Sequence, residues 1–96
     1  MGASTFVVSS SGATAEKAFN NAVTHARWES GNGGYTGTIA EKHSFIILPL
    51  GAGMDATQRA LELLDQDDGR VSDKWGPAGC FSLGEGRYLF FGWASS

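Results

Sequence analysis

The period of the hydrophobic pattern changes between residues 9 and 15, and this change constrains the fold most. Residues 4–9 are rich in β-branched and aromatic side chains and are followed by serines and Gly12, which predicts a strand and a turn. From Ala15 onward, apolar and mostly small residues recur at helical spacing as far as Ala26. The regular pattern fails near Trp28, where we expect the helix to end. The apolar residues from Ala15 to Ala26 form one narrow stripe along the helix, and because most of them are small, the helix can lie close against a sheet.

The rest of the chain supplies more strands and a second helix. After a glycine-rich segment, residues 36–41 and 44–48 are interpreted as two strands joined at Lys42-His43. Asp55 followed by Gln58 resembles a capping box and predicts a helix, whose buried stripe contains Ala56, Ala60, Leu63 and Leu64. Residues 80–83 and 87–93 flank a Gly-Glu-Gly turn and predict a carboxy-terminal hairpin.

This element order predicts an α+β fold in a single domain spanning residues 1–96. A βαββαβ core is the split-βαβ, ferredoxin-like arrangement, in which two helices cover one face of an antiparallel sheet. We expect that arrangement here, extended by the final hairpin.

Charge and cysteine content exclude several classes of function. The formal net charge is −3 and the basic residues form no stripe, so nucleic acid is not an expected partner. Cys80 is the single cysteine, which rules out an intramolecular disulfide and favours a reducing compartment. No apolar run approaches the ~20 residues of a membrane span. We therefore expect a cytoplasmic protein that does not bind membranes.

Three segments carry a resemblance to known proteins: GGYTGTIAEK at 33–42, DKWGPAGC at 73–80 and LFFGWAS at 89–95. Through these segments, nearly the whole chain resembles a group of small proteins from bacteriophages and bacteria. The resemblance implies a phage or prophage setting, and it carries no activity over to individual residues.

The glycine-rich segment at 31–37 has two interpretations. Glycine loops that bind nucleotide phosphates follow a strand and open a helix, whereas this one follows a helix, enters a strand and lacks the Gly-Lys-Ser/Thr ending. One interpretation is a structural turn from helix to strand. The other is a pocket lined by backbone amides and Tyr35, since glycine permits the close approach of a ligand.

Catalytic and metal-binding patterns are weak. Cys80 paired with His25 or His43 is an enzymatic alternative, but a cysteine at the start of an apolar strand is usually a small buried hydrophobe. An EF-hand that began at Asp65 would need glycine at position 70, where this chain has Arg70. Two histidines and one cysteine at wide spacing give no zinc signature. We expect no metal site and no cofactor.

Large aromatic residues at element ends or in loops are the more informative set, because amphipathic rings there can anchor a partner or stack on a flat ligand. The alternative is that they cap a small core. The predicted ligand- or partner-binding residues are Trp28, Gly33, Gly34, Tyr35, Thr36, Trp75 and Trp93.

The leading hypothesis is a small non-enzymatic binding protein, such as a phage-encoded modulator that occupies a host protein or sequesters a small molecule. The alternatives are a small cytosolic enzyme that uses Cys80 and a structural self-assembling domain.

A homodimer is also expected. Phe90 and Phe91 face opposite sides of a strand, so helices on one sheet face would leave the other ring uncovered. A second copy about a two-fold axis would cover it, through the open face or the edge of the sheet and with Trp93 contributing.

Overall fold

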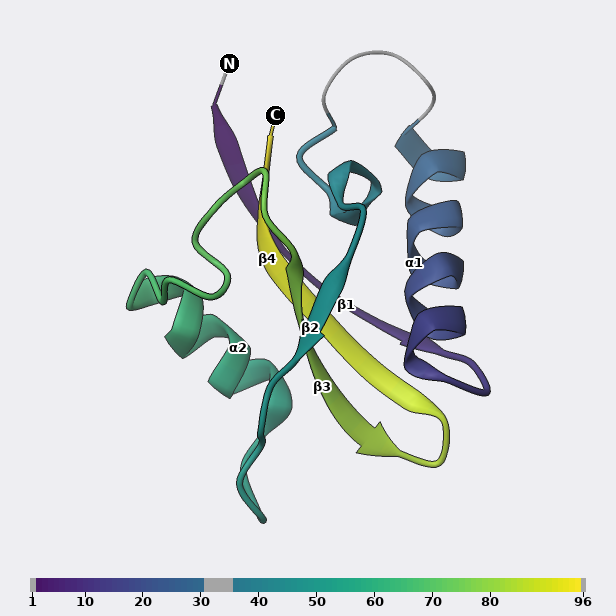
Figure 1. Cartoon of the computed structure of the whole chain (residues 1–96), viewed down its shortest axis with the longest axis vertical. Coiled ribbons are helices and arrows are strands. Elements are labelled where there is room, and N and C mark those ends of the chain that lie inside the picture. Colours follow the sequence, from purple (N-terminus) through teal and green to yellow (C-terminus); the bar gives the residue numbers. More distant parts are fainter. Residues whose placement is uncertain (1, 31–35, 96) are drawn as a thin grey trace.

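The computed structural model describes residues 2–30 and 36–95 and contains two helices and a four-stranded mixed sheet (Figure 1). The α+β class is therefore confirmed. The elements in chain order are β1 (Ala3–Ser11), α1 (Ala15–Ser30), the short 3-10 helix η1 (Ile39–Glu41), β2 (Phe45–Ile47), α2 (Ala56–Asp65), β3 (Ala78–Gly84) and β4 (Arg87–Ser95).

The strand order across the sheet is β1-β4-β3-β2. Strand β4 is antiparallel to both β1 and β3, whereas β2 is parallel to β3. The expectation of a wholly antiparallel sheet is thus wrong at β2. The segment between β2 and β3 contains α2 and is long enough for a crossover connection, so that β3 can run in the same direction as β2.

The predicted strand at residues 36–41 is instead an irregular segment followed by η1. The Thr38 hydroxyl accepts a hydrogen bond from the Ala40 amide and caps η1, and the Glu41 carboxylate accepts bonds from both the amide and the hydroxyl of Thr36. Such local bonds offer the backbone an alternative to a sheet ladder. With this strand missing, the order of elements differs from the split-βαβ arrangement that the sequence predicted.

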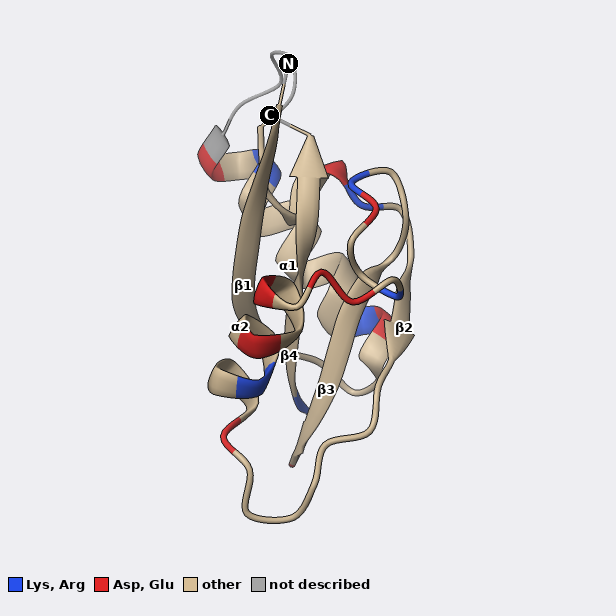
Figure 2. Ribbon diagram, turned by 90° about the vertical axis from the view of Figure 1, so that its left-hand side faces the viewer, with Lys and Arg blue, Asp and Glu red and all other residues tan. Residues whose placement is uncertain are grey.

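The two helices cover opposite faces of the sheet, and the expectation that they share one face is wrong (Figures 1 and 2). Helix α1 packs with Phe6 and Phe90 on one face, and α2 packs with Phe81 and Phe91 on the other. Across the strand order, the connection through α1 leads from β1 at one edge to β2 at the other edge. The connection through α2 leads back from β2 to its neighbour β3. Two crossovers of the same hand therefore place their helices on opposite faces.

Both faces of the central strand are consequently buried. Phe90 and Phe91 are each 0% exposed, so neither ring is left for a partner, which corrects the basis of the predicted dimer. Phe90 packs edge-on to Phe19 of α1 at 5.5 Å between ring centroids, and Phe91 stacks on Phe81 at 5.0 Å. The open-face form of the predicted dimer is therefore wrong, and a dimer through the edge of the sheet stays a prediction.

The carboxy-terminal hairpin is confirmed, with longer strands than predicted. Residues Glu85 and Gly86 connect the paired residues Gly84 and Arg87. Both connecting residues have positive φ, 56° and 75°, as a two-residue type I′ turn requires.

Candidate docking edge

Strand β1 forms one edge of the sheet along its whole length of nine residues. Its sequence, ASTFVVSSS, contains no charged residue and no proline, which are the usual devices that prevent an edge from pairing with another strand. The opposite edge is β2, which has three residues. The β1 edge is therefore the longer template for strand pairing.

The backbone of β1 alternates between two directions. The Gly12 amide donates to the Gly86 carbonyl at 2.9 Å, and hydrogen-bonded pairs recur at every second residue of an antiparallel ladder. It follows that Ser4, Phe6, Val8 and Ser10 bond to β4, whereas the amides and carbonyls of Thr5, Val7 and Ser9 point away from the sheet. Within the described ranges no protein group bonds to these three outward residues.

A hollow of about 530 Å³ lies on the α1 side of this edge. It lies between residues 8–11 of β1 and the flank of α1 that carries Asn21, His25 and Glu29. The Asn21 amide donates to the Ser11 carbonyl at 2.9 Å, and His25 lies 2.9 Å from the Glu29 carboxylate. This flank therefore places hydrogen-bonding groups beside a lining that is otherwise largely apolar, from Val8, Ala22, Ala26 and Ile39.

A second hollow, of about 580 Å³, lies on the α2 side of the same strand. Its apolar lining comes from Leu61, Leu64 and Trp93, and Asp65 and Asp67 give it a negative charge. The indole Nε1 of Trp93 is buried without a hydrogen-bond partner among the described residues. Thr5 completes the lining. Side chains of a strand added to β1 would alternate between these two hollows, because successive residues point to opposite faces.

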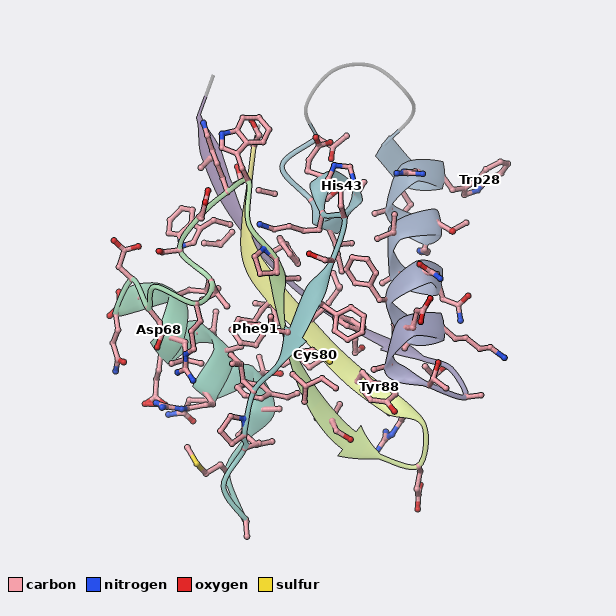
Figure 3. All side chains as sticks on the ribbon, viewed as in Figure 1. Trp28, His43, Asp68, Cys80, Tyr88 and Phe91 are labelled. Carbon is pink, nitrogen blue, oxygen red and sulfur yellow. The ribbon has the colours of Figure 1, made fainter. Side chains whose placement is uncertain are left out.

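The members of the predicted aromatic and glycine site that the structure describes do not share a single surface. Trp28 is 88% exposed near the end of α1 and points away from the sheet (Figure 3), whereas Trp93 packs against the core on the α2 side. Trp75 is 61% exposed in the loop before β3, where the Lys74 ammonium lies 5.4 Å from its ring centroid. Gly33, Gly34 and Tyr35 lie outside the described residues.

Thr36 has a structural position, not an exposed one. It is half-buried, and its hydroxyl contacts the Thr38 hydroxyl at 2.8 Å and donates to Glu41 at 3.0 Å. These bonds hold the entry to η1. Of the predicted residues that the structure describes, Trp93 is the one that lines a hollow beside β1.

The loop that carries Trp75 is anchored by Lys42, which is 2% exposed. Its ammonium donates to the backbone carbonyls of Asp73, Lys74 and Gly76 at 3.2, 3.3 and 2.9 Å. Burial lowers the pKa of Lys42, and the Asp73 carboxylate opposes that shift. This buried lysine therefore has a structural role, which the sequence did not reveal.

The arrangement around Cys80 does not favour nucleophilic chemistry. Cys80 is 0% exposed in the core under α1, and burial raises the pKa of its thiol to about 11. A reactive cysteine instead has a depressed pKa and access to solvent. His25 and His43 are exposed, and Figure 3 shows Cys80 in the middle of the sheet with His43 near its upper end.

The acidic segment after α2 is also structural. Asp68 accepts two side-chain bonds from the Arg70 guanidinium, each at 2.9 Å, and this pairing lowers the pKa of Asp68 to about 2. Among the residues that the structure describes, no group of three or more potential metal ligands occurs. Over the same residues, neither helix has the length and apolar character needed to cross a bilayer.

The docking edge itself was missed from the sequence. The uncharged sequence of residues 3–11, which ends in three serines, was available as a signal. It does not show that this strand lies at an edge, because an edge strand can be identified only once the strand order is known.

Comparison with known proteins adds no relative: no protein-family model, curated protein or solved structure matches this chain.

Proposed function

We propose that this chain is a small non-enzymatic binding protein that docks an extended polypeptide segment along the free edge of β1. The observation that carries the proposal is the set of outward amides and carbonyls at Thr5, Val7 and Ser9. An added strand would satisfy these groups through main-chain hydrogen bonds, which supply affinity without a particular sequence.

The two hollows give the edge its selectivity. On the α2 side, Leu61 and Trp93 favour an apolar side chain, and Asp65 and Asp67 favour a cationic end. On the α1 side, Asn21, His25 and Glu29 favour a side chain with a polar end, beside the apolar contacts that Val8 and Ile39 offer. A preferred segment therefore alternates polar residues with apolar or cationic ones.

A binding role suits this molecule better than the enzymatic alternative, because the buried Cys80 thiol keeps its proton at neutral pH. The resemblance of the chain to phage and bacterial proteins favours a host protein as the partner, in the cytoplasm of the host cell.

A peptide-display selection against the immobilised protein tests the proposal. Ser9→Pro removes an outward amide, and proline is tolerated on an edge whose amide faces solvent, so the fold should survive. Ser9→Ala is the matched control, because it keeps the amide. We expect the selected peptides to bind the wild type and Ser9→Ala and to lose binding to Ser9→Pro. Peptides that bind all three proteins equally would show that β1 is not the docking strand.

A further inference from the structure

We infer that the segment that occupies the β1 edge in the isolated protein is β1 of a second copy of this chain. The two strands run antiparallel about a two-fold axis at Val7, and the two sheets become one continuous sheet. This inference rests on the proposed docking role of the edge and names the partner that the chain itself supplies.

The backbone of β1 is complementary to itself. Val7 is the midpoint of Ala3–Ser11, and it is also one of the residues whose amide and carbonyl point outward. With Val7 on the axis, Thr5 lies opposite Ser9 of the second copy, and both have outward groups. Each such pair exchanges two backbone hydrogen bonds. A register shifted by one residue would place outward groups opposite inward ones.

The side chains along this seam are compatible with the pairing. The two Val7 side chains meet on the α2 face, and Phe6 lies beside Val8 of the second copy on the α1 face. Val7 and Val8 are only half-buried in the single chain, so pairing removes further apolar surface from water. No charged residue of β1 is buried by the contact.

The charges near the two ends of β1 complement each other on the α2 face. Asp65 and Asp67 line the hollow beside Thr5, and acidic residues are prominent on this side of the molecule (Figure 2). Arg87 pairs with Ser11 at the other end of the strand and has the strand parity of Leu89, which also faces α2. Antiparallel pairing brings Arg87 of one copy to the acidic end of the other.

Dimerisation through this edge would also control the proposed function. A second copy and a foreign segment use the same backbone groups, so the two compete. The free edge then becomes more available as the protein is diluted.

Sedimentation velocity over a range from low to high micromolar concentration tests the dimer. We expect the wild type and Ser9→Ala to form dimers reversibly. Ser9→Pro should raise the dimer dissociation constant by about four- to a hundredfold, because one hydrogen bond is lost on each side of the axis and each is worth roughly a two- to tenfold factor. A wild type that stays monomeric at high micromolar concentration would overturn the inference, as would an equally stable Ser9→Pro dimer.

Charge reversal tests the orientation. Arg87→Glu should weaken the dimer, and combining it with Asp65→Lys and Asp67→Lys should restore it. Arg27→Glu, at an exposed position of α1, makes the same change in net charge and should leave the dimer unchanged. Equal effects of Arg87→Glu and Arg27→Glu would overturn the antiparallel seam.

These experiments separate the dimer from the docking role. A monomeric wild type whose selected peptides still require the Ser9 amide would refute the second copy and retain the docking edge. A dimer that survives Ser9→Pro, together with peptides that ignore this substitution, would refute both.

Discussion

At the scale of single residues, Lys42 shows how a buried charge is tolerated. Its three carbonyl acceptors replace the water that burial removes, and they hold the loop before β3. Lys42→Met would leave these carbonyls without their charged donor. We expect it to lower the free energy of unfolding by about 2 to 3 kcal/mol in urea titrations.

The matched control for this prediction is Lys17→Met on α1, where the lysine is exposed. Its effect should stay within about 0.5 kcal/mol. A Lys42→Met protein that is as stable as the control would show that the three bonds contribute nothing net.

Cys80 gives a prediction about pH. In the unfolded chain the pKa of a cysteine thiol is ~8.5, whereas the folded Cys80 thiol has a pKa of about 11. Between these values the folded state binds more protons than the unfolded state, so stability falls as pH rises, by up to about 1.4 kcal/mol per pH unit.

Urea unfolding between pH 8 and pH 10.5 measures this slope, and Cys80→Ala supplies the reference because it lacks the thiol. The wild type should lose more stability than Cys80→Ala over this interval. Parallel pH profiles of the two proteins would contradict a raised pKa for the buried Cys80 thiol, as would rapid alkylation of Cys80 in the native protein.

At the scale of elements, close packing between β3 and β4 depends on Gly79. A Cβ atom at this position would lie 2.5 Å from the Phe91 ring. Gly79→Ala must therefore displace a ring that is stacked on Phe81, and we expect a loss of about 1 to 3 kcal/mol in stability.

Gly69→Ala is the comparison, since a Cβ there meets no atom within 4 Å. It should change stability by no more than about 0.5 kcal/mol. Thermal melting of the two variants checks the difference, and equal melting temperatures would show that Phe91 relaxes without cost.

Most elements could be predicted because their signals are local. The small-residue stripe predicted α1, and Asp55 caps α2 by accepting a bond from the Gln58 amide at 3.2 Å, as the sequence pattern indicated. The error at residues 36–41 has a local cause too. β-branched residues favour strands, but here the hydroxyls of Thr36 and Thr38 bond within the segment.

At the scale of the whole molecule, the strand order and the placement of the helices could not be predicted. Periodicity shows which side of a helix is apolar, but not which face of the sheet the helix covers. The density of apolar residues in β4 was visible in the sequence, and it reflects a central strand buried on both faces. The candidate site was missed for the same reason, since an edge is defined only by the order of strands.

The central position of β4 predicts that truncation abolishes folding. Deletion from Arg87 onward removes the strand that pairs with both β1 and β3, along with Phe90 and Phe91, each worth roughly 1.5 to 3 kcal/mol when buried. Circular dichroism of the truncated chain should show no cooperative melting. A melting transition like that of the full chain would refute the central role of β4.

The free edge of β1 is tested most directly by residue-resolved amide hydrogen exchange measured by NMR at two protein concentrations. At low concentration, we expect the amides of Phe6, Val8 and Ser10 to exchange slowly and those of Thr5, Val7 and Ser9 to exchange fast, because only the first set bonds to β4. At high concentration, Thr5, Val7 and Ser9 should become protected as a second copy pairs with them. Exchange of these three amides that is slow in the dilute monomer, or fast at every concentration, would contradict the account.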